Sequence, residues 1–408
     1  MRIAFISYEH PLGIAGGGIG TYLGQIAKLM AGRGNEVEVF TCHQQLNNTI
    51  EHEGYIVRRV HASSIAEFRQ RVVDVFAEQH LAFPFDILEA AEYGAEALGV
   101  KEQFPGLSLV VKLHTPSYLT HQLNGKEVSL SQKARFHIGG LLKGKLNKAY
   151  WIYRKEEDVE YRQICLADAI CSPSTSLSEL VKEHWPITKP IAVIPNPFVP
   201  SADFLNLPPA SAKGEELSVS FFGRLELRKG ILQLMAAIPL VLQQNRKVSF
   251  RFIGKPHPSP IDGMDMEDYL KKNLVKWLDH LHFFGYQPYD KMPELLAQTQ
   301  VCVFPSLWEN FPNVCLEAMA AGRAVIASDN GGMAEMIQHG ENGLLVPPTD
   351  PQAIANAIVR LAEHHELITE MGEKARQRVL DAYNEKAIGD LVQSFYLSTM
   401  AKKSVITA

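Results

Sequence analysis

Short apolar runs alternate with longer amphipathic stretches along most of this 408-residue chain. In the first half, apolar runs predict strands at 2–7, 36–42, 55–60, 86–89, 108–113, 168–172 and 191–194. In the second half, they predict strands at 217–222, 248–253, 281–285, 300–304, 324–327 and 343–346. Buried strands that alternate with helices are typical of parallel sheets joined by crossover helices. The pattern therefore predicts an α/β fold.

A proline-rich segment separates the two series of strands. Residues 195–213 read PNPFVPSADFLNLPPASAK, which is the composition of a linker. The chain is also longer than one hydrophobic core usually serves. We therefore predict two domains, at 1–200 and 201–384, with ligands bound beyond the carboxyl ends of their strands.

Two glutamates, Glu309 and Glu317, stand eight residues apart at a predicted strand-to-helix junction. Asn313 followed by VCLEAMAAG indicates a capped helix, which puts Glu309 in the loop and Glu317 in the first turns. The unpaired amides of residues 311–314 favour an anion, and ionised carboxylates accept hydrogen bonds from sugar hydroxyls. The pair favours a sugar nucleotide. The structural alternative to a binding role is that Glu317 only stabilises the start of the helix and that Glu309 is a solvated loop charge.

Two cations follow another predicted strand, in the segment VSFFGRLELRKG at 219–230. Arg224 ends the strand, and a helix is expected after Lys229. A guanidinium fork and a compact ammonium charge together suit a diphosphate. The alternative is a pair of ordinary surface charges, although cations at a helix N-terminus oppose the helix dipole.

A glycine-rich turn follows the first predicted strand. Gly16, Gly17, Gly18 and Gly20 open a helix, where backbone amides can approach an anionic ligand without a Cβ in the way. Close packing alone also explains such a turn. The spacing fails the dinucleotide fingerprint, so an NAD-dependent oxidoreductase is the weaker alternative.

Together these elements closely resemble the retaining glycosyltransferases of family 4, and the resemblance covers nearly the whole chain. Further matches are IPNPF at 194–198, SDNGGMAEMI at 328–337 and GLLVPPTD at 343–350. The resemblance implies the GT-B fold, in which two Rossmann-like domains with parallel sheets face each other across a cleft. It also implies that a final helix, within 385–408, crosses back to the first domain.

The resemblance assigns roles to residues at matching positions. Arg224 and Lys229 would bind the donor diphosphate, and Glu317 the ribose. The transferred sugar would be held by Glu309 and the backbone after it, together with His114. His114 ends another predicted strand. The implied donor-binding set is Gly17, Gly18, Arg224, Lys229, Glu309, Asn310, Phe311, Asn313, Val314 and Glu317; the implied catalytic set is His114, Glu309, Arg224 and Lys229. For His114, a strand end capped by a turn is the alternative, and Pro312 removes one amide donor from the loop.

Composition and net charge restrict the kinds of partner and the cellular compartment that we expect for this protein. A net charge of −5 argues against a general nucleic-acid binder. The five cysteines have no CxxC spacing, and the opening residues do not form a secretory signal, so we expect a cytoplasmic protein. The basic, aromatic segment 126–155 suggests peripheral contact with an anionic membrane or a lipid-linked acceptor. The alternative is a helix pair with inward-facing aromatic residues and solvated lysines.

The predicted function is retaining transfer of a hexose from a nucleotide sugar, with UDP-glucose or a related UDP-sugar as the expected donor, to a saccharide or lipid-linked acceptor in polysaccharide biosynthesis. No cofactor and no metal is expected, since the family is metal-independent. The alternative in another class is a catalytically idle nucleotide-sugar-binding protein of the same fold. Phosphorylase chemistry is disfavoured, because no pyridoxal-binding site is recognisable in the sequence.

Overall fold

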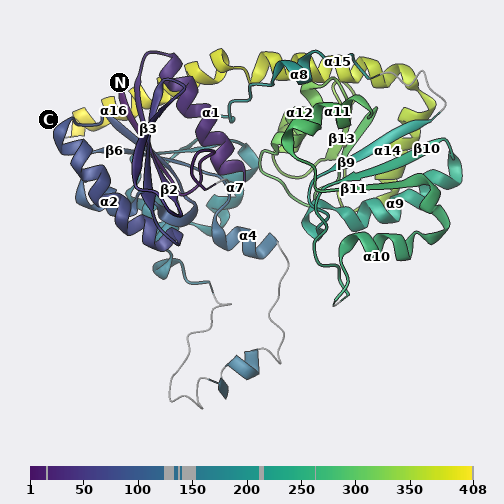
Figure 1. The fold of residues 1–408 in the computed structure, drawn as a ribbon, viewed down its shortest axis with the longest axis horizontal. Helices are drawn as coiled ribbons and strands as arrows, with labels where there is room; N and C mark the ends of the chain where they lie inside the picture. Colours follow the sequence, from purple (N-terminus) through teal and green to yellow (C-terminus); the bar gives the residue numbers. More distant parts are fainter. Residues whose placement is uncertain are drawn as a thin grey trace.

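The computed structural model describes residues 1–14, 17–123, 133–136, 138–139, 153–210, 216–261 and 263–406. Within these ranges the chain forms two α/β halves, each built around one sheet with helices on both faces (Figure 1). The predicted two-domain α/β architecture is therefore confirmed. Each of the thirteen predicted strands is present, with its ends within two residues of the expected positions.

The first sheet has the strand order β3-β4-β2-β1-β5-β6-β7-β8. Its strands are β1 (Arg2–Ser7), β2 (Glu36–His43), β3 (Asn48–His52), β4 (Tyr55–His61), β5 (Ile87–Ala91), β6 (Ser108–Lys112), β7 (Ala169–Ser172) and β8 (Ile191–Val193). All neighbours are parallel except β3, which pairs antiparallel with β4 at the edge. The sequence did not predict β3, because its residues are mostly exposed and form no apolar run.

The second sheet has the order β11-β10-β9-β12-β13-β14, and all its pairs are parallel. Its strands are β9 (Leu217–Phe222), β10 (Val248–Ile253), β11 (Leu281–Gly285), β12 (Val301–Phe304), β13 (Ala324–Ser328) and β14 (Leu344–Val346). The central strands are buried on both faces. That burial explains why their sequences are continuous apolar runs rather than alternating ones.

Helices cover both faces of each sheet. On the first sheet, one face carries α1 (Gly18–Gly32) and the other carries α2 (Ile65–Ala82), α3 (Leu98–Gln103), α6 (Val159–Leu166) and α7 (Thr175–His184). On the second sheet, one face carries α9 (Ile231–Gln244), α10 (Met266–Asn273) and α14 (Pro351–Glu363) and the other carries α11 (Met292–Ala297), α12 (Asn313–Ala320) and α13 (Met333–Met336). The remaining helices are α4 (Ser117–Leu123), α8 (Ala202–Leu205) and α15 (His365–Ala382), with short 3₁₀ turns η1 (Tyr93–Ala95), η2 (Lys155–Glu157), η3 (Leu227–Lys229), η4 (Val275–His280) and η5 (Tyr289–Lys291).

The final helix, α16 (Glu385–Ile406), joins the two halves (Figure 1). It follows α15 of the second half and packs against the first sheet, where Ile388, Val392 and Tyr396 are buried beside α1. The Tyr396 hydroxyl donates to Glu89 Oε2 at 2.6 Å in that core. The chain therefore starts and finishes on the same half, and the second half lies between two covalent connections.

Most of the basic segment 126–155 lies outside the described residues. Tyr153 is described, and its hydroxyl accepts a hydrogen bond from Trp185 Nε1 and donates to Asp158. In the described part of the chain, no helix combines the length and the apolar character needed to cross a bilayer.

Candidate active site

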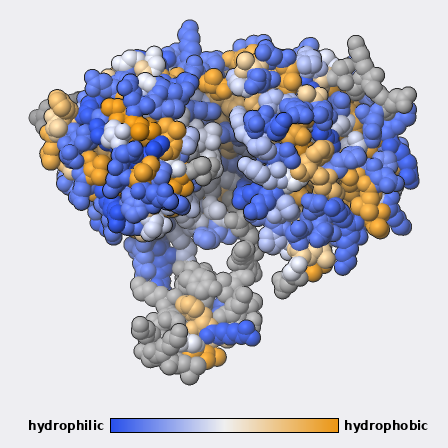
Figure 2. All heavy atoms as spheres, in the orientation of Figure 1, coloured by the Kyte–Doolittle hydropathy of each residue, from blue (hydrophilic) through white to orange (hydrophobic). Residues whose placement is uncertain are grey.

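A cleft of about 1140 Å³ lies between the two halves and is lined by residues from both. Figure 2 shows the hollow between two largely hydrophilic halves. The walls come from the loops that follow β1, β6, β9 and β12, all at the carboxyl ends of parallel strands. This is the place where open α/β sheets bind ligands, and Glu309, Glu317 and His114 all line it.

The loop after β9 carries the predicted cations, but only one of them contacts the predicted carboxylates. Lys229 Nζ lies 2.7 Å from Glu309 Oε1. Arg224 is half-exposed and pairs with Glu226 Oε1 at 3.1 Å. Arg228, which was not predicted, places Nη1 2.5 Å from Glu309 Oε1. Its place directly before Lys229 was the signal that could have identified it.

Tight backbone contacts set the position of these cations. The residues Leu227–Lys229 form the turn η3, which ends at Gly230 with a φ of +70°. A Cβ on Gly230 would lie 1.8 Å from the carbonyl oxygen of Pro305, so the turn needs glycine both for its conformation and for space. The Leu307 amide also donates to the Arg228 carbonyl at 2.9 Å. The loops after β9 and β12 are therefore held against each other.

Glu309 is buried, with 12 % of its side chain exposed. Its carbonyl accepts from the Gly332 amide at 2.8 Å, and Gly331 packs so closely that a Cβ there would lie 2.3 Å from that carbonyl. Burial alone would raise the pKa of the Glu309 carboxyl, but the charges and hydrogen bonds of Lys229 and Arg228 outweigh burial and lower it. The carboxylate is therefore ionised and held between two cations.

Glu317 lies in a contrasting environment on α12. It is buried, and the described part of the chain provides its carboxylate with no hydrogen bond or ion pair. Burial raises the pKa of the Glu317 carboxyl to about 7. An unpartnered carboxylate on a cleft wall is destabilising unless a ligand donates to it.

The start of α12 differs from the prediction. Asn313 was expected to cap this helix, but it is already the first helical residue, and Pro312 occupies the N-cap position with φ −75° and ψ 116°. Among the residues that the structure describes, no side chain caps the helix. The first amides of α12 are therefore left without side-chain partners at the cleft, where Asn313 and Val314 line the wall.

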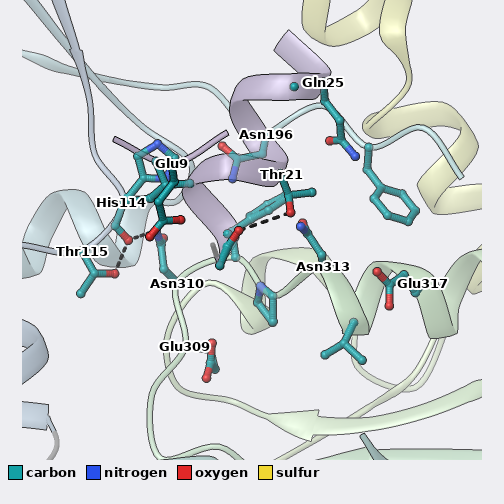
Figure 3. Close-up of a pocket in the computed structure, with 18 of the residues that line it drawn as sticks. Glu9, Thr21, Gln25, His114, Thr115, Asn196, Glu309, Asn310, Asn313 and Glu317 are labelled. Atoms are coloured by element: carbon teal, nitrogen blue, oxygen red, sulfur yellow. Dashed lines mark hydrogen bonds between the residues drawn. The ribbon is translucent and has the colours of Figure 1, made fainter. Parts of the chain in front are cut away.

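His114 lines the cleft directly beside Asn310 (Figure 3). Its ring packs edge-on against Tyr22, with 5.1 Å between the ring centroids. Burial and then the nearby charge of Lys112 lower the pKa of His114 to about 3. The imidazole is therefore neutral near pH 7. Donation of a ring N–H to a hydroxyl remains available.

A buried glutamate that the sequence analysis missed supports this histidine. The two carboxylate oxygens of Glu92 each lie 2.8 Å from the His114 amide, and Oε1 also accepts from the Thr115 amide at 2.6 Å. Burial raises the pKa of Glu92 to about 8, and the charge of Glu160 adds to this. Glu92 follows β5 directly, which places it at the same sheet edge as His114.

The remaining predicted residues fall into two groups. Gly17 caps α1 and Gly18 begins it, both line the cleft, and a Cβ on either would meet no described atom within 4 Å. Close packing therefore does not explain these two glycines. Asn310 and Phe311 line the opposite wall, where Phe311 packs against Tyr383 with 5.5 Å between ring centroids. Gly16 lies outside the described residues.

The geometry defines a site for a ligand that is both anionic and rich in hydroxyl groups. Lys229, Arg228 and the first amides of α12 supply positive charge and donors along one wall. Glu309 and Glu317 supply acceptors on the same wall (Figure 3). The fold and the site thus define the class of two-domain GT-B enzymes.

Comparison with known proteins agrees with this class. Residues 16–201 match the family described as Glycosyltransferase Family 4, and residues 216–364 match Glycosyl transferases group 1. An uncharacterised glycosyltransferase of Methanocaldococcus jannaschii is 26 % identical over 94 % of this chain and 95 % of its own. Sucrose-phosphate synthase of Thermosynechococcus elongatus is 26 % identical with a TM-score of 0.70, over 98 % of this chain and 99 % of its own.

HepE of Anabaena, solved with UDP-glucose, is 18 % identical and has a TM-score of 0.65 over 98 % of this chain and 100 % of its own, which shows a shared fold. The chain therefore carries one glycosyltransferase domain of each of the two matched families and has the GT-B fold. It is a glycosyltransferase.

Proposed function

We propose that this enzyme transfers a hexose from a nucleotide sugar to a hydroxyl of a saccharide or lipid-linked acceptor, with retention of the anomeric configuration. UDP-glucose is the proposed donor, and polysaccharide biosynthesis is the proposed context. The UDP-glucose complex of HepE, which shares the fold, supports a UDP-sugar. Retention is supported by the resemblance to family 4.

One observation carries the proposal: the contrast between Glu309 and Glu317 on the same wall of the cleft. Glu309 is ionised between Lys229 and Arg228, whereas Glu317 has no partner among the described residues and a pKa raised to about 7 by burial. A nucleotide sugar matches both environments. Its diphosphate would lie against the cations, its ribose hydroxyls would donate to Glu317, and its hexose hydroxyls would donate to Glu309.

In the proposed reaction, the bond between the sugar C1 and the diphosphate oxygen breaks while the acceptor oxygen bonds to C1 on the same face. The acceptor proton passes to the departing diphosphate. Arg224, Lys229 and the amides at the start of α12 stabilise the negative charge that develops on the diphosphate, which is electrostatic catalysis. These protein groups take the role that a metal ion has in other transferases, so we propose metal-independent transfer.

His114 acts in this scheme as a neutral hydrogen-bond donor to a hydroxyl of the transferred sugar. Closure of the two domains excludes water and brings His114 to the sugar held by Glu309. A shut cleft is also needed to limit hydrolysis of the donor.

The experiment that tests this proposal measures thermal stabilisation and donor hydrolysis with a panel of UDP-, GDP- and ADP-sugars. Selective stabilisation with release of free nucleotide from a UDP-sugar is the expected result. Stabilisation without any release, even with candidate acceptors added, would favour the catalytically idle binding protein. Release from only a GDP- or ADP-sugar would overturn the choice of donor.

A further inference from the structure

The side chain of Asn310 bridges the two halves of the molecule. Its Nδ2 donates to the His114 carbonyl at 2.8 Å, and its Oδ1 accepts from Ser174 Oγ at 2.8 Å. Asn310 belongs to the loop after β12, whereas His114 and Ser174 belong to the first half. Figure 3 shows Asn310 reaching from the donor-side loop toward His114 and Thr115.

The chemistry of the partners permits only one orientation of this amide. Ser174 Oγ already accepts from the Leu177 amide at 3.2 Å, so its own proton is directed to Asn310 Oδ1. The His114 carbonyl has no proton and only accepts. An aspartate at position 310 would therefore place an acceptor against an acceptor, with almost no change in shape.

The backbone around His114 is thus held from both sides. Glu92 of the first half accepts from the His114 and Thr115 amides, and Asn310 of the second half donates to the His114 carbonyl. The Glu92 contacts lie within one half and hold the His114 segment from that side alone. The Asn310 contact exists only while the halves are together.

A second contact spans the halves beside the first. The Glu335 carboxylate, in α13 of the second half, accepts from the Thr175 and Ser176 amides at 2.9 Å each. Those amides open α7, and Ser174 is the N-cap of the same helix. A carboxylate at a helix N-terminus is favourable, so Glu335 brings Ser174 to Asn310 when the halves meet.

We propose that Asn310 is a positioning residue that fixes the His114 backbone across the closed cleft and thereby sets the imidazole against the transferred sugar. Asn310 follows Glu309 directly, so the loop that holds the sugar also holds the histidine that contacts it. Closure and placement of His114 are then one event. The contact of His114 with a sugar rests on the proposed function, whereas the link between the halves does not.

The test compares Asn310→Asp with a matched variant, Asn330→Asp. Asn330 Nδ2 donates to the Leu307 carbonyl at 2.7 Å, which is the same kind of bond in a neighbouring loop but within one half. Hydrogen–deuterium exchange is measured without nucleotide on peptides covering 113–119 and 174–178. Steady-state hydrolysis of UDP-glucose is then measured for both variants, and thermal unfolding checks that each is folded.

Asn310→Asp is expected to raise exchange about tenfold in both peptides, which lie in the half that carries no substitution. Because one hydrogen bond to a neutral group is worth about a factor of ten, kcat should fall about tenfold while KM stays within about threefold. Asn330→Asp should leave exchange in both peptides unchanged. The proposal would be overturned if exchange in Asn310→Asp were unchanged or equal to that in Asn330→Asp. It would also be overturned if Asn310→Asp changed only KM.

The two measurements separate this inference from the proposed function. If the wild type hydrolyses no nucleotide sugar, the proposed function fails, and the exchange comparison alone decides whether Asn310 holds the His114 segment. If hydrolysis occurs but exchange does not respond to Asn310→Asp, the function stands and the positioning role is wrong.

Discussion

Replacing Glu317 by glutamine should stabilise the protein in the absence of nucleotide. The carboxylate is buried without a partner in the described structure, and burial raises its pKa from the ordinary 4.5 to about 7. Ionisation of Glu317 therefore acts against folding. Glutamine keeps the shape of the side chain and removes the charge, so Glu317→Gln relieves this cost while it weakens the acceptor offered to a ribose.

The magnitude and its pH dependence follow from the same pKa. Between pH 4.5 and about 7 the folded protein binds the proton more tightly than the unfolded chain, so this contribution to stability is lost as pH rises through that window. Each pKa unit corresponds to about 1.4 kcal/mol. The variant should therefore match the wild type near pH 4.5 and exceed it by about 3 kcal/mol in free energy of unfolding at pH 8.

The assay is calorimetric unfolding of wild type and Glu317→Gln from pH 5 to 8, with Glu309→Gln as the matched control. The substitution at Glu309 should change the free energy of unfolding in the opposite direction. Lys229 and Arg228 lower the pKa of Glu309 against the effect of burial. Its stabilisation is present above the ordinary pKa, so Glu309→Gln should destabilise the protein at pH 8. A Glu317→Gln variant that is no more stable than wild type at pH 8, or whose advantage shrinks as pH rises, would refute this reasoning.

Three further predictions concern the proposed reaction and its location. Burial and Lys112 keep the pKa of His114 at about 3, so a pH–rate profile should show no loss of kcat from His114 protonation between pH 5 and 8; a limb in that range that disappears in His114→Asn would count against a neutral imidazole. Treatment with EDTA should leave donor hydrolysis unchanged, and activity restored only by a divalent cation would overturn metal independence. If the basic segment 126–155 contacts an anionic membrane, the protein should sediment with anionic liposomes at low salt; protein that stays in the supernatant would exclude this contact and favour the helix pair.

The fold was largely predictable because most strands are central in their sheets and buried on both faces. Continuous apolar runs follow from that burial, as in β12 and β13. The edge strand β3 was missed, since exposed residues carry no such run. The cap of α12 was also mispredicted: asparagine is a favoured capping residue, but the helix begins one residue earlier than expected, with Pro312 at the N-cap and Asn313 as the first helical residue.

The residues that line the site could be predicted from the sequence, but most of the contacts between distant residues could not. Spacing alone indicated Glu309, Glu317 and Lys229, because each belongs to a strand-to-helix junction. Contacts between the halves, such as Asn310 with His114 at a separation of 196 residues, depend on how the two domains meet. The pKa values of the site residues depend on burial and on neighbouring charges, which are also set by the folded structure. They therefore cannot be inferred from the spacing of residues in the sequence.

The most direct test of the central claim, that Glu317 binds the nucleotide and Glu309 the sugar, is calorimetric titration of UDP into wild type, Glu317→Ala and Glu309→Ala. Loss of hydrogen bonds to a charged acceptor should weaken UDP binding to Glu317→Ala by at least about tenfold. Glu309→Ala should bind UDP within about threefold of wild type, since its carboxylate serves the sugar, and should lose turnover instead. Equal losses of UDP affinity in the two variants, or no loss in Glu317→Ala, would contradict the account.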